Sequence, residues 1–226
     1  MINGDGWQHF NIWEHSETVR DLYRRRCLRE VEEMTAHAQA AELLAPRVKS
    51  GDAVLDAGCG SGYFFHSLTS RSISADYFGI DASEGLIAIG RDTLPKFGLP
   101  ADRLTVQRIE DTGGTCEHVV CLNVLSNIDN YHRPLERMLL MARKSVILRE
   151  SLKDGAAYHY VRDNYLDAGV DLKVYVNHYD IGEVTTFIRN YGFDVERVTD
   201  RRTGGKPESV IGHDHYWTFL VATRRV

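Results

Sequence analysis

The residues best placed for chemistry lie in one stretch, 54–64, with the sequence VLDAGCGSGYF. A short apolar run leads into a G-x-G-x-G turn, and helix-forming residues follow it. Glycines at such a turn let the backbone bend sharply and approach a ligand with no Cβ in the way. A helix beginning there offers free N–H groups and the positive end of its dipole to an anion. The stretch therefore predicts a binding loop between a strand and a helix.

Two acidic residues accompany this loop. Asp56 precedes the first glycine by two positions, and Asp81 ends the next apolar run, 19 residues after Gly62. A carboxylate at the end of the second strand can accept hydrogen bonds from ribose hydroxyls. Asp56 could instead cap the turn, and Asp81 could cap the next helix. A lone glycine loop is weak evidence, but the loop with both acids favours a nucleoside-containing ligand.

The elements that must position these residues follow from the hydrophobic pattern. Short apolar runs at 53–57, 77–81, 104–107, 118–122 and 145–150 alternate with helical stretches at 62–70, 84–97 and 133–143, which is typical of a parallel sheet covered on both faces. A helix over 181–190 has a capping box from Asp180 to Glu183. The last strands, 193–198 and 216–222, are joined without a helix and are predicted to be antiparallel neighbours. The expected fold class is α/β, with a seven-stranded, mostly parallel sheet and an antiparallel last strand.

The length of 226 residues indicates a single domain, 1–226. Within it, 1–45 is predicted to be a helical cap, because apolar residues from Val19 to Ala41 recur at spacings of three and four along one helix that ends before Pro46. The core is expected at 46–226, with an irregular, tyrosine-rich insertion at 152–179. The cap also carries aromatic residues that either pack into the core or form a lid over a cationic or apolar ligand: Trp7, Phe10, Trp13 and Tyr23.

The motif VLDAGCGSGYF, followed by GIDAS, resembles the class I S-adenosylmethionine-dependent methyltransferases that act on small molecules. Its spacing is G-x-G-x-G, whereas dehydrogenases have G-x-G-x-x-G, so a nicotinamide dehydrogenase is a weak alternative. The resemblance covers about 40–226 and also rests on the CEHVVCLNVLSNID stretch and the reversed last strand. It implies a Rossmann-like sheet preceded by a helical cap.

The resemblance implies S-adenosyl-L-methionine as the cofactor. Gly58, Gly60 and the helix after Gly62 would hold the methionine arm, with Asp56 near its ammonium. Asp81 would bind the ribose. In addition, the adenine would lie near Ala82, Ile109 and Glu110, although Arg108 stands where the family commonly carries an acid. Cys59 lies within the loop as a small filler, and Asn123, after the fourth run, would flank the methyl end. The implied cofactor set is Asp56, Gly58, Cys59, Gly60, Gly62, Asp81, Ala82, Ile109, Glu110 and Asn123.

Methyl transfer from a sulfonium is an in-line displacement with an activated donor, so the protein mainly aligns the acceptor and excludes water. A general base helps when the acceptor is a hydroxyl or a charged amine. The candidate bases are His132, His178 and His215, although His178 could be a structural hydrogen-bonding residue and the 213–215 stretch a polar strand entry. We expect methyl transfer to oxygen or nitrogen of a small molecule. The alternative is a non-catalytic protein that binds S-adenosylmethionine or S-adenosylhomocysteine.

Composition limits the partners and the compartment. The net charge is −5, and no basic stripe is present, which disfavours nucleic acid as a substrate. No signal peptide or long apolar run is seen, which predicts a cytoplasmic protein without a membrane partner. The four cysteines are interpreted as reduced thiols, and no cluster has the spacing of metal ligands. A homodimer is left open, and the sequence does not identify the acceptor.

Overall fold

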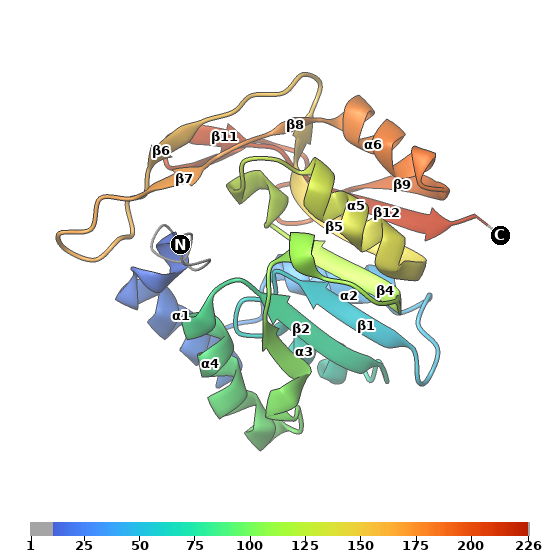
Figure 1. Ribbon diagram of the computed structural model, residues 1–226, viewed down its shortest axis with the longest axis horizontal. Helices are drawn as coiled ribbons and strands as arrows, with labels where there is room; N and C mark the ends of the chain where they lie inside the picture. Colours follow the sequence, from blue (N-terminus) through green and yellow to red (C-terminus); the bar gives the residue numbers. More distant parts are fainter. Residues whose placement is uncertain (1–10, 226) are drawn as a thin grey trace, which may run out of the picture.

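The computed structural model of the protein describes residues 11–225. Trp7 and Phe10 of the predicted aromatic cap lie outside this range. The central sheet has the strand order β3-β2-β1-β4-β5-β12-β9 (Figure 1). Its strands are β1 (Ala53–Ala57), β2 (Asp76–Asp81), β3 (Leu104–Val106), β4 (Cys116–Leu122), β5 (Ala142–Lys153), β9 (Phe193–Thr199) and β12 (Trp217–Arg224).

The direction of each strand agrees with the prediction. Strands β3, β2, β1, β4 and β5 pair in parallel, whereas β12 runs antiparallel to both β5 and β9. A two-residue strand, β8 (Tyr179–Asp180), adds to the far end of β5. The mostly parallel α/β sheet with a reversed last strand is therefore confirmed.

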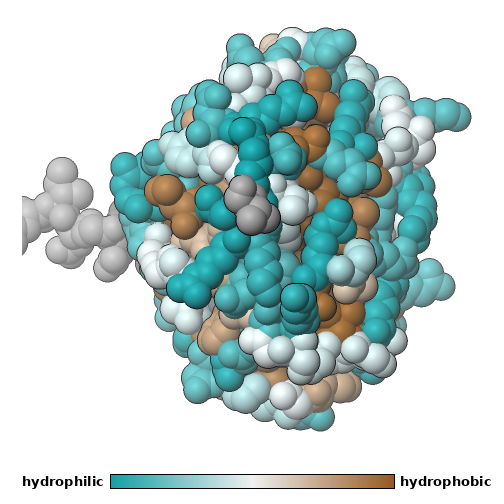
Figure 2. Space-filling view, turned by 90° about the vertical axis from the view of Figure 1, so that its right-hand side faces the viewer, coloured by the Kyte–Doolittle hydropathy of each residue, from teal (hydrophilic) through white to brown (hydrophobic). Residues whose placement is uncertain are grey.

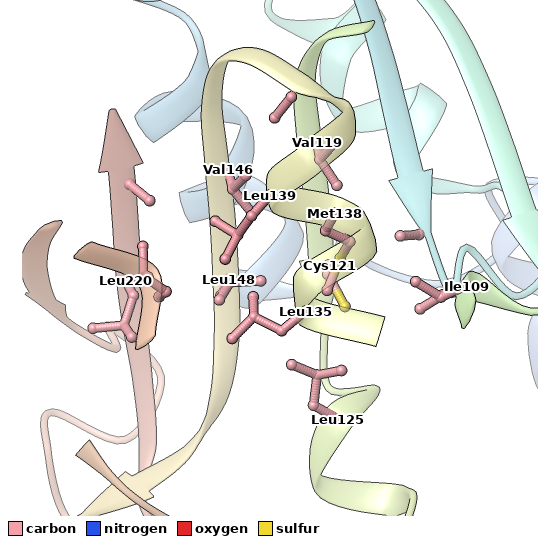
Figure 3. Close-up of a cluster of buried hydrophobic side chains, with 14 of the residues drawn as sticks. Ile109, Val119, Cys121, Leu125, Leu135, Met138, Leu139, Val146, Leu148 and Leu220 are labelled. Atoms are coloured by element: carbon pink, nitrogen blue, oxygen red, sulfur yellow. The ribbon is translucent and has the colours of Figure 1, made fainter. Parts of the chain in front are cut away.

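Alternation along the buried strands sends neighbouring side chains to opposite faces of the sheet. Val54, Val120 and Ile147 belong to a core shared with α2 (Thr35–Leu44), α3 (Phe64–Ser70) and α4 (Glu84–Thr93). The opposite face packs against α5 (His132–Met141) and α6 (Ile181–Asn190). Figure 3 shows Leu135 and Met138 of α5 lying across β4 and β5. These two cores fix the ends of the parallel strands, where a ligand site is expected.

The cap differs from its prediction. One helix was expected over most of 17–45, but the structure has two, α1 (Glu17–Cys27) and α2, separated by 28–34. Arg29 adopts a left-handed backbone conformation with φ of 60°, so the first helix cannot continue through it. The spacing of apolar residues continues across the break because both helices bury one side, so periodicity alone hides the turn. Ser16 does cap α1, as predicted, accepting a hydrogen bond from the Val19 amide.

Smaller shifts affect other predicted boundaries. The helix predicted at 62–70 begins at Phe64, and the helix predicted at 84–97 ends at Thr93 and continues as a 3-10 turn, Leu94–Phe97. The helix predicted at 133–143 ends at Met141, since β5 begins at Ala142. Each shift moves only an element end, so the order of elements is unchanged.

The insertion at 152–179 is more regular than predicted. It contains the antiparallel hairpin of β6 (Tyr160–Arg162) and β7 (Lys173–Tyr175), and a second hairpin pairs β10 (Glu208–Val210) with β11 (His213–His215). These hairpins stand beside the N-terminal segment (Figure 1). A small apolar cluster of Ile12, Val174 and Val176 joins them to the 3-10 turn Ile12–Glu14. The insertion therefore packs against the cap.

The molecular surface near the C-terminal end of the chain is mostly hydrophilic, with apolar side chains in narrow bands (Figure 2). Among residues 11–225, no helix is both long and apolar enough to cross a bilayer. All four cysteines are buried free thiols. A homodimer stays a prediction.

Candidate active site

A cavity of about 870 Å³ opens at the carboxyl ends of β1, β2 and β4. It lies within the size range of ligand pockets. The loops after these strands form one end, and α1, α2 and the two hairpins form the rest. Two compartments follow from this construction. We name the end formed by 56–60, 81–82 and 107–110 the cofactor compartment, and the part bounded by Ile12, Trp13, the hairpins and Trp217 the acceptor compartment.

Hydrogen bonds hold the glycine loop against the end of β2. The amides of Gly58 and Cys59 donate to the Ile80 carbonyl at 2.8 and 3.0 Å, and the Gly60 amide donates to Asp81 Oδ2 at 2.7 Å. Gly60 has a φ of 57°, and a Cβ there would overlap the Tyr23 ring of α1. The loop therefore needs glycine for its backbone conformation and for the close approach of the cap.

Two carboxyl groups lie at the cofactor compartment, Asp56 buried and Asp81 partly buried. Asp81 also accepts a hydrogen bond from the Ser83 amide at 2.8 Å, and burial raises its pKa against the lowering effect of these amides. Asp56 accepts a hydrogen bond from the Tyr77 hydroxyl at 2.7 Å. Burial raises the pKa of Asp56 to about 7, the Tyr77 hydrogen bond opposes this, and the Asp81 charge adds to it. Across the described chain, no cation forms an ion pair with Asp56, so the site has room for a positive group there.

Nine of the ten predicted cofactor residues line the cavity. Gly62 does not, because the space beside its Cα is filled by Leu104 and Leu94. Glu110 forms an ion pair with Arg108 at 3.0 Å, which places the acid beside the unexpected arginine. Burial raises the pKa of the Cys59 thiol well above its ordinary value, in keeping with a small filler. The lining set is Asp56, Gly58, Cys59, Gly60, Asp81, Ala82, Ile109, Glu110 and Asn123.

The turn after β4 carries Asn123, which lines the cavity. Asn123 has a left-handed backbone conformation with φ of 61°, and its side-chain oxygen accepts a hydrogen bond from Arg149. Asparagine tolerates this conformation better than most residues. The buried carboxylate of Glu150 accepts hydrogen bonds from the amides of Val124, Leu125 and Ser126 at 2.9–3.0 Å. Glu150 thus holds the turn that presents Asn123 to the cavity.

Arg149 was not predicted, and it supports two residues that line the cavity, because it donates a hydrogen bond to Asn123 and packs on Trp217. It is 1% exposed, and its Nε donates to Asp200 Oδ2 at 2.7 Å. Its guanidinium lies 4.5 Å from the centre of the Trp217 ring, and its Nη2 is buried without a hydrogen-bond partner among the described atoms. A buried guanidinium with an unused donor is costly, which marks this place as a ligand site or a strained one.

Of the three predicted histidines, His215 lines the cavity. Its ring stacks on Trp217 with 4.4 Å between centres and 2° between planes. Both ring nitrogens are buried and make no hydrogen bond to any part of the chain that the structure describes. Burial, with smaller effects from His178 and Arg149, lowers the pKa of His215 to about 4, so the ring is neutral at pH 7.

The other two predicted bases lie outside the cavity. His132 is exposed at the start of α5, with its Nδ1 2.9 Å from Asn130 Oδ1. His178 is partly buried with its ring edge on Tyr216, and its backbone pairs with Ala157. Their positions favour structural roles for both.

A further histidine was missed. His37 of α2 lines the cavity and stacks on Tyr63 with 4.5 Å between ring centres. Its Nδ1 is buried without a partner, and burial, together with Arg26 and Arg149, lowers its pKa to about 3. The available signal was a histidine within a helix stripe otherwise made of small apolar residues. Trp13 and Tyr23 of the cap also line the cavity, as the lid interpretation requires. Residues 11–225 contain no cluster of three potential metal ligands.

Comparison with known proteins agrees with this geometry. The sequence matches the family model described as a methyltransferase domain over residues 23–198. No curated protein matches it. Magnesium protoporphyrin IX methyltransferase from Synechocystis PCC 6803, with bound S-adenosylmethionine, has a similar fold (TM-score 0.57, 18% identity, 99% of this chain and 93% of that one).

Two further structures have similar folds. The 1,6-didemethyltoxoflavin-N1-methyltransferase of Burkholderia thailandensis has a TM-score of 0.58 at 15% identity, covering 84% of this chain and 78% of that one. The amino pentose methyltransferase CalS10 of Micromonospora echinaspora has a TM-score of 0.58 at 17% identity, covering 88% and 94%. With the matched family model, the glycine loop and the sheet order, the chain belongs to the methyltransferase domain family, as a class I S-adenosylmethionine-dependent methyltransferase.

Proposed function

We propose that the protein transfers the methyl group of S-adenosylmethionine to an oxygen or nitrogen atom of a small-molecule acceptor. The observation that supports this most directly is one cavity lined both by the glycine loop with Asp81 and by the apolar and aromatic residues of the hairpins, with Asn123 also in its lining. Proteins of similar fold are named for small acceptors: a magnesium porphyrin, 1,6-didemethyltoxoflavin and an amino pentose.

The residues of the cofactor compartment fit the proposed cofactor. The buried Asp56 carboxyl has no cationic partner among the described residues and would face the ammonium of the methionine arm, beside glycines that leave room for it. Asp81 would accept hydrogen bonds from the ribose hydroxyls, and Ile109 would pack against the adenine. When bound, the cofactor supplies a methyl group already activated on a sulfonium.

His215 is the proposed general base. Its neutral ring would take the proton of the acceptor heteroatom as the bond from that atom to the methyl carbon forms. The bound cofactor would supply the methyl carbon and would keep the electron pair of the carbon–sulfur bond on its sulfur, and His215 would pass the proton to water. Both ring nitrogens are covered in this structure, so neighbouring side chains must move as the acceptor binds. The unmet hydrogen bonds favour that rearrangement.

Two measurements test the proposal. Calorimetry with S-adenosylmethionine tests cofactor binding, and Asp81→Ala is expected to weaken it at least tenfold. Release of S-adenosylhomocysteine across an acceptor panel tests catalysis. With a working acceptor, His215→Ala is expected to slow turnover at least tenfold, whereas His132→Ala, outside the cavity, keeps the parental rate. An equal effect of both substitutions would remove His215 from this role. Tight cofactor binding without turnover on any acceptor would favour the alternative, a non-catalytic binding protein.

A further inference from the structure

We propose that the acceptor is a flat, largely apolar molecule, an aromatic or heteroaromatic ring system that carries one proton-bearing oxygen or nitrogen. It would lie in the acceptor compartment with its heteroatom toward His215 and Asn123. This inference rests on the proposed function and specifies its substrate class.

The walls of the acceptor compartment are apolar. Ile12 of the cap, Val174 and Val176 of the insertion and Ile211 of the second hairpin belong to one small apolar cluster, and all four line the cavity. Three segments distant in the sequence thus converge on one surface. Burying such a surface is favourable for a ligand whose own body is apolar, because the gain follows the apolar area removed from water.

Aromatic side chains mark the opening and the inner end of the compartment. Tyr160 and Tyr165 line the cavity while 50% and 62% exposed, so they stand at its opening. Tyr160 lies 4.5 Å from Tyr175 between ring centres. At the inner end, the rings of His215 and Trp217 are parallel. Aromatic faces and edges favour planar partners through offset or edge-to-face contacts.

The charged side chains here are ion-paired, hydrogen-bonded within the protein, or exposed. Arg202 forms an ion pair with Glu208, and Asp163 accepts a hydrogen bond from the Tyr165 amide at 2.6 Å. Arg26 also lines the cavity, where it is half-buried, donates to the Tyr63 hydroxyl at 3.0 Å and lies over the Tyr23 and Tyr63 rings. Lys173 and Asp129 line it too and are exposed. A charged acceptor would have to give up its hydration on entering this largely apolar compartment, which is costly.

Few buried side-chain polar atoms of the histidines that line the cavity are left without a hydrogen-bond partner. His215 contributes two ring nitrogens, and His37 contributes Nδ1, all of them buried without a partner in the described chain. Trp217 stacks on His215, and the Arg149 guanidinium lies 4.5 Å from the centre of the same Trp217 ring. One heteroatom with its proton can satisfy such a small set, whereas a sugar or peptide would leave many of its own polar groups unpaired.

The test measures binding to protein saturated with S-adenosylhomocysteine, whose own binding is measured first. The probes are 2-naphthol and 5-hydroxyindole, compared with 2-naphthoate and with glucose. The two flat neutral probes are expected to bind at least tenfold more tightly than either comparison compound. Equal or tighter binding of naphthoate or glucose, or no binding of the flat probes, would overturn the inference. If S-adenosylhomocysteine does not bind, the proposed function fails, and the same probe comparison on the unloaded protein still decides the nature of the compartment.

Matched tyrosine variants test the location. Tyr175→Ala removes a ring that lines the cavity from a surface hairpin, so the fold should tolerate it. Tyr158→Ala removes a 58% exposed tyrosine of the same insertion that does not line the cavity. We expect Tyr175→Ala to weaken 2-naphthol binding about threefold to tenfold with S-adenosylhomocysteine binding unchanged, and Tyr158→Ala to change neither. Equal effects of the two variants would place the probe outside the compartment and overturn the assignment.

Discussion

The buried carboxyl of Asp56 makes a quantitative prediction about cofactor affinity and pH. In the cofactor-free protein its pKa is raised to about 7, mainly by burial, from its ordinary value of 3.8. An ammonium placed beside the carboxylate would favour its charged form and return the pKa toward the ordinary value. Cofactor binding should therefore release a proton from Asp56 between about pH 5 and pH 7. The proposed contact predicts that affinity rises with pH across this window.

Linkage gives the size of the effect. With a pKa of about 7 before binding and about 4 after it, the association constant increases about 50-fold between pH 5 and pH 7 and levels off above pH 7. In the cofactor-free protein, the stability of the fold changes with pH in the direction opposite to the change in cofactor affinity. The folded state holds the proton more tightly than the unfolded state, so the free energy of unfolding falls by about 4 kcal/mol between roughly pH 4 and pH 7.

The assay is calorimetry with S-adenosylhomocysteine, which carries the same ammonium and carboxylate, in buffers of different ionisation enthalpy. Work below pH 7.5 keeps the α-amino group of the ligand protonated. His37 and His215, with pKa values of about 3 and 4, titrate below the window. Asp56→Asn is the matched control, because it keeps the size of the side chain and a hydrogen-bond acceptor for Tyr77, and it leaves Asp81 in place.

The parent should release close to one proton per ligand near pH 6, and Asp56→Asn should release far less and bind with little dependence on pH. A parental affinity that is flat from pH 5 to pH 7 would refute the reasoning. So would an unchanged slope in the variant, since the proton would then come from Asp81 or another group.

Three further substitutions give distinct outcomes. Gly60→Ala places a Cβ on the Tyr23 ring at a positive φ, so calorimetry should show cofactor affinity reduced at least tenfold; parental affinity would contradict the close packing of the cap. Arg149→Met leaves the Asp200 carboxylate buried without its cation, so urea unfolding should show a loss of about 3–5 kcal/mol that a second substitution, Asp200→Asn, partly restores; a single variant as stable as the parent would show that the pair contributes nothing. Glu150→Gln replaces one of two accepting oxygens with a donor amide, so unfolding should show a loss of about 1–3 kcal/mol and turnover should fall more than cofactor affinity; unchanged turnover would separate the β4 turn from catalysis.

The cofactor compartment could be predicted from the sequence because it is built locally. The glycine loop, Asp56 and Asp81 lie within 26 residues of chain, in one strand–helix–strand unit whose geometry depends on glycine and on buried alternation. Each side chain there is fixed by its own neighbours, as the hydrogen bond from the Gly60 amide to Asp81 shows. The spacing of these residues along the sequence is therefore enough to predict the site. Nine of the ten implied residues line one cavity.

The acceptor compartment could not be predicted in the same way. The break between α1 and α2 depends on Arg29 taking a left-handed conformation. No glycine or proline in 28–34 indicates a helix end there. The hairpin in the insertion forms against the cap, where the Ser16 hydroxyl donates to the Tyr165 carbonyl across 149 residues. Contacts at such separation have no periodic signature in the sequence. Helix α2, which carries His37, packs beside β5, which carries Arg149, only because the cap and the sheet are folded together.

Because the two compartments are built differently, substitutions should affect them separately. The Glu14 carboxylate of the cap accepts hydrogen bonds from the Ser83 hydroxyl at 2.6 Å and the Gly85 amide at 3.0 Å, two and four residues beyond the predicted ribose ligand Asp81. The cap is thus fastened to the cofactor compartment at one side and to the insertion at the other, through Ser16. Substitutions in the hairpins alter the acceptor wall without touching the strand–helix–strand unit that holds the cofactor. The acceptor wall is held in place by contacts between residues far apart in the sequence, whereas the cofactor loop is held by residues close to it in the sequence. The choice of acceptor can therefore vary in this fold while cofactor binding stays constant.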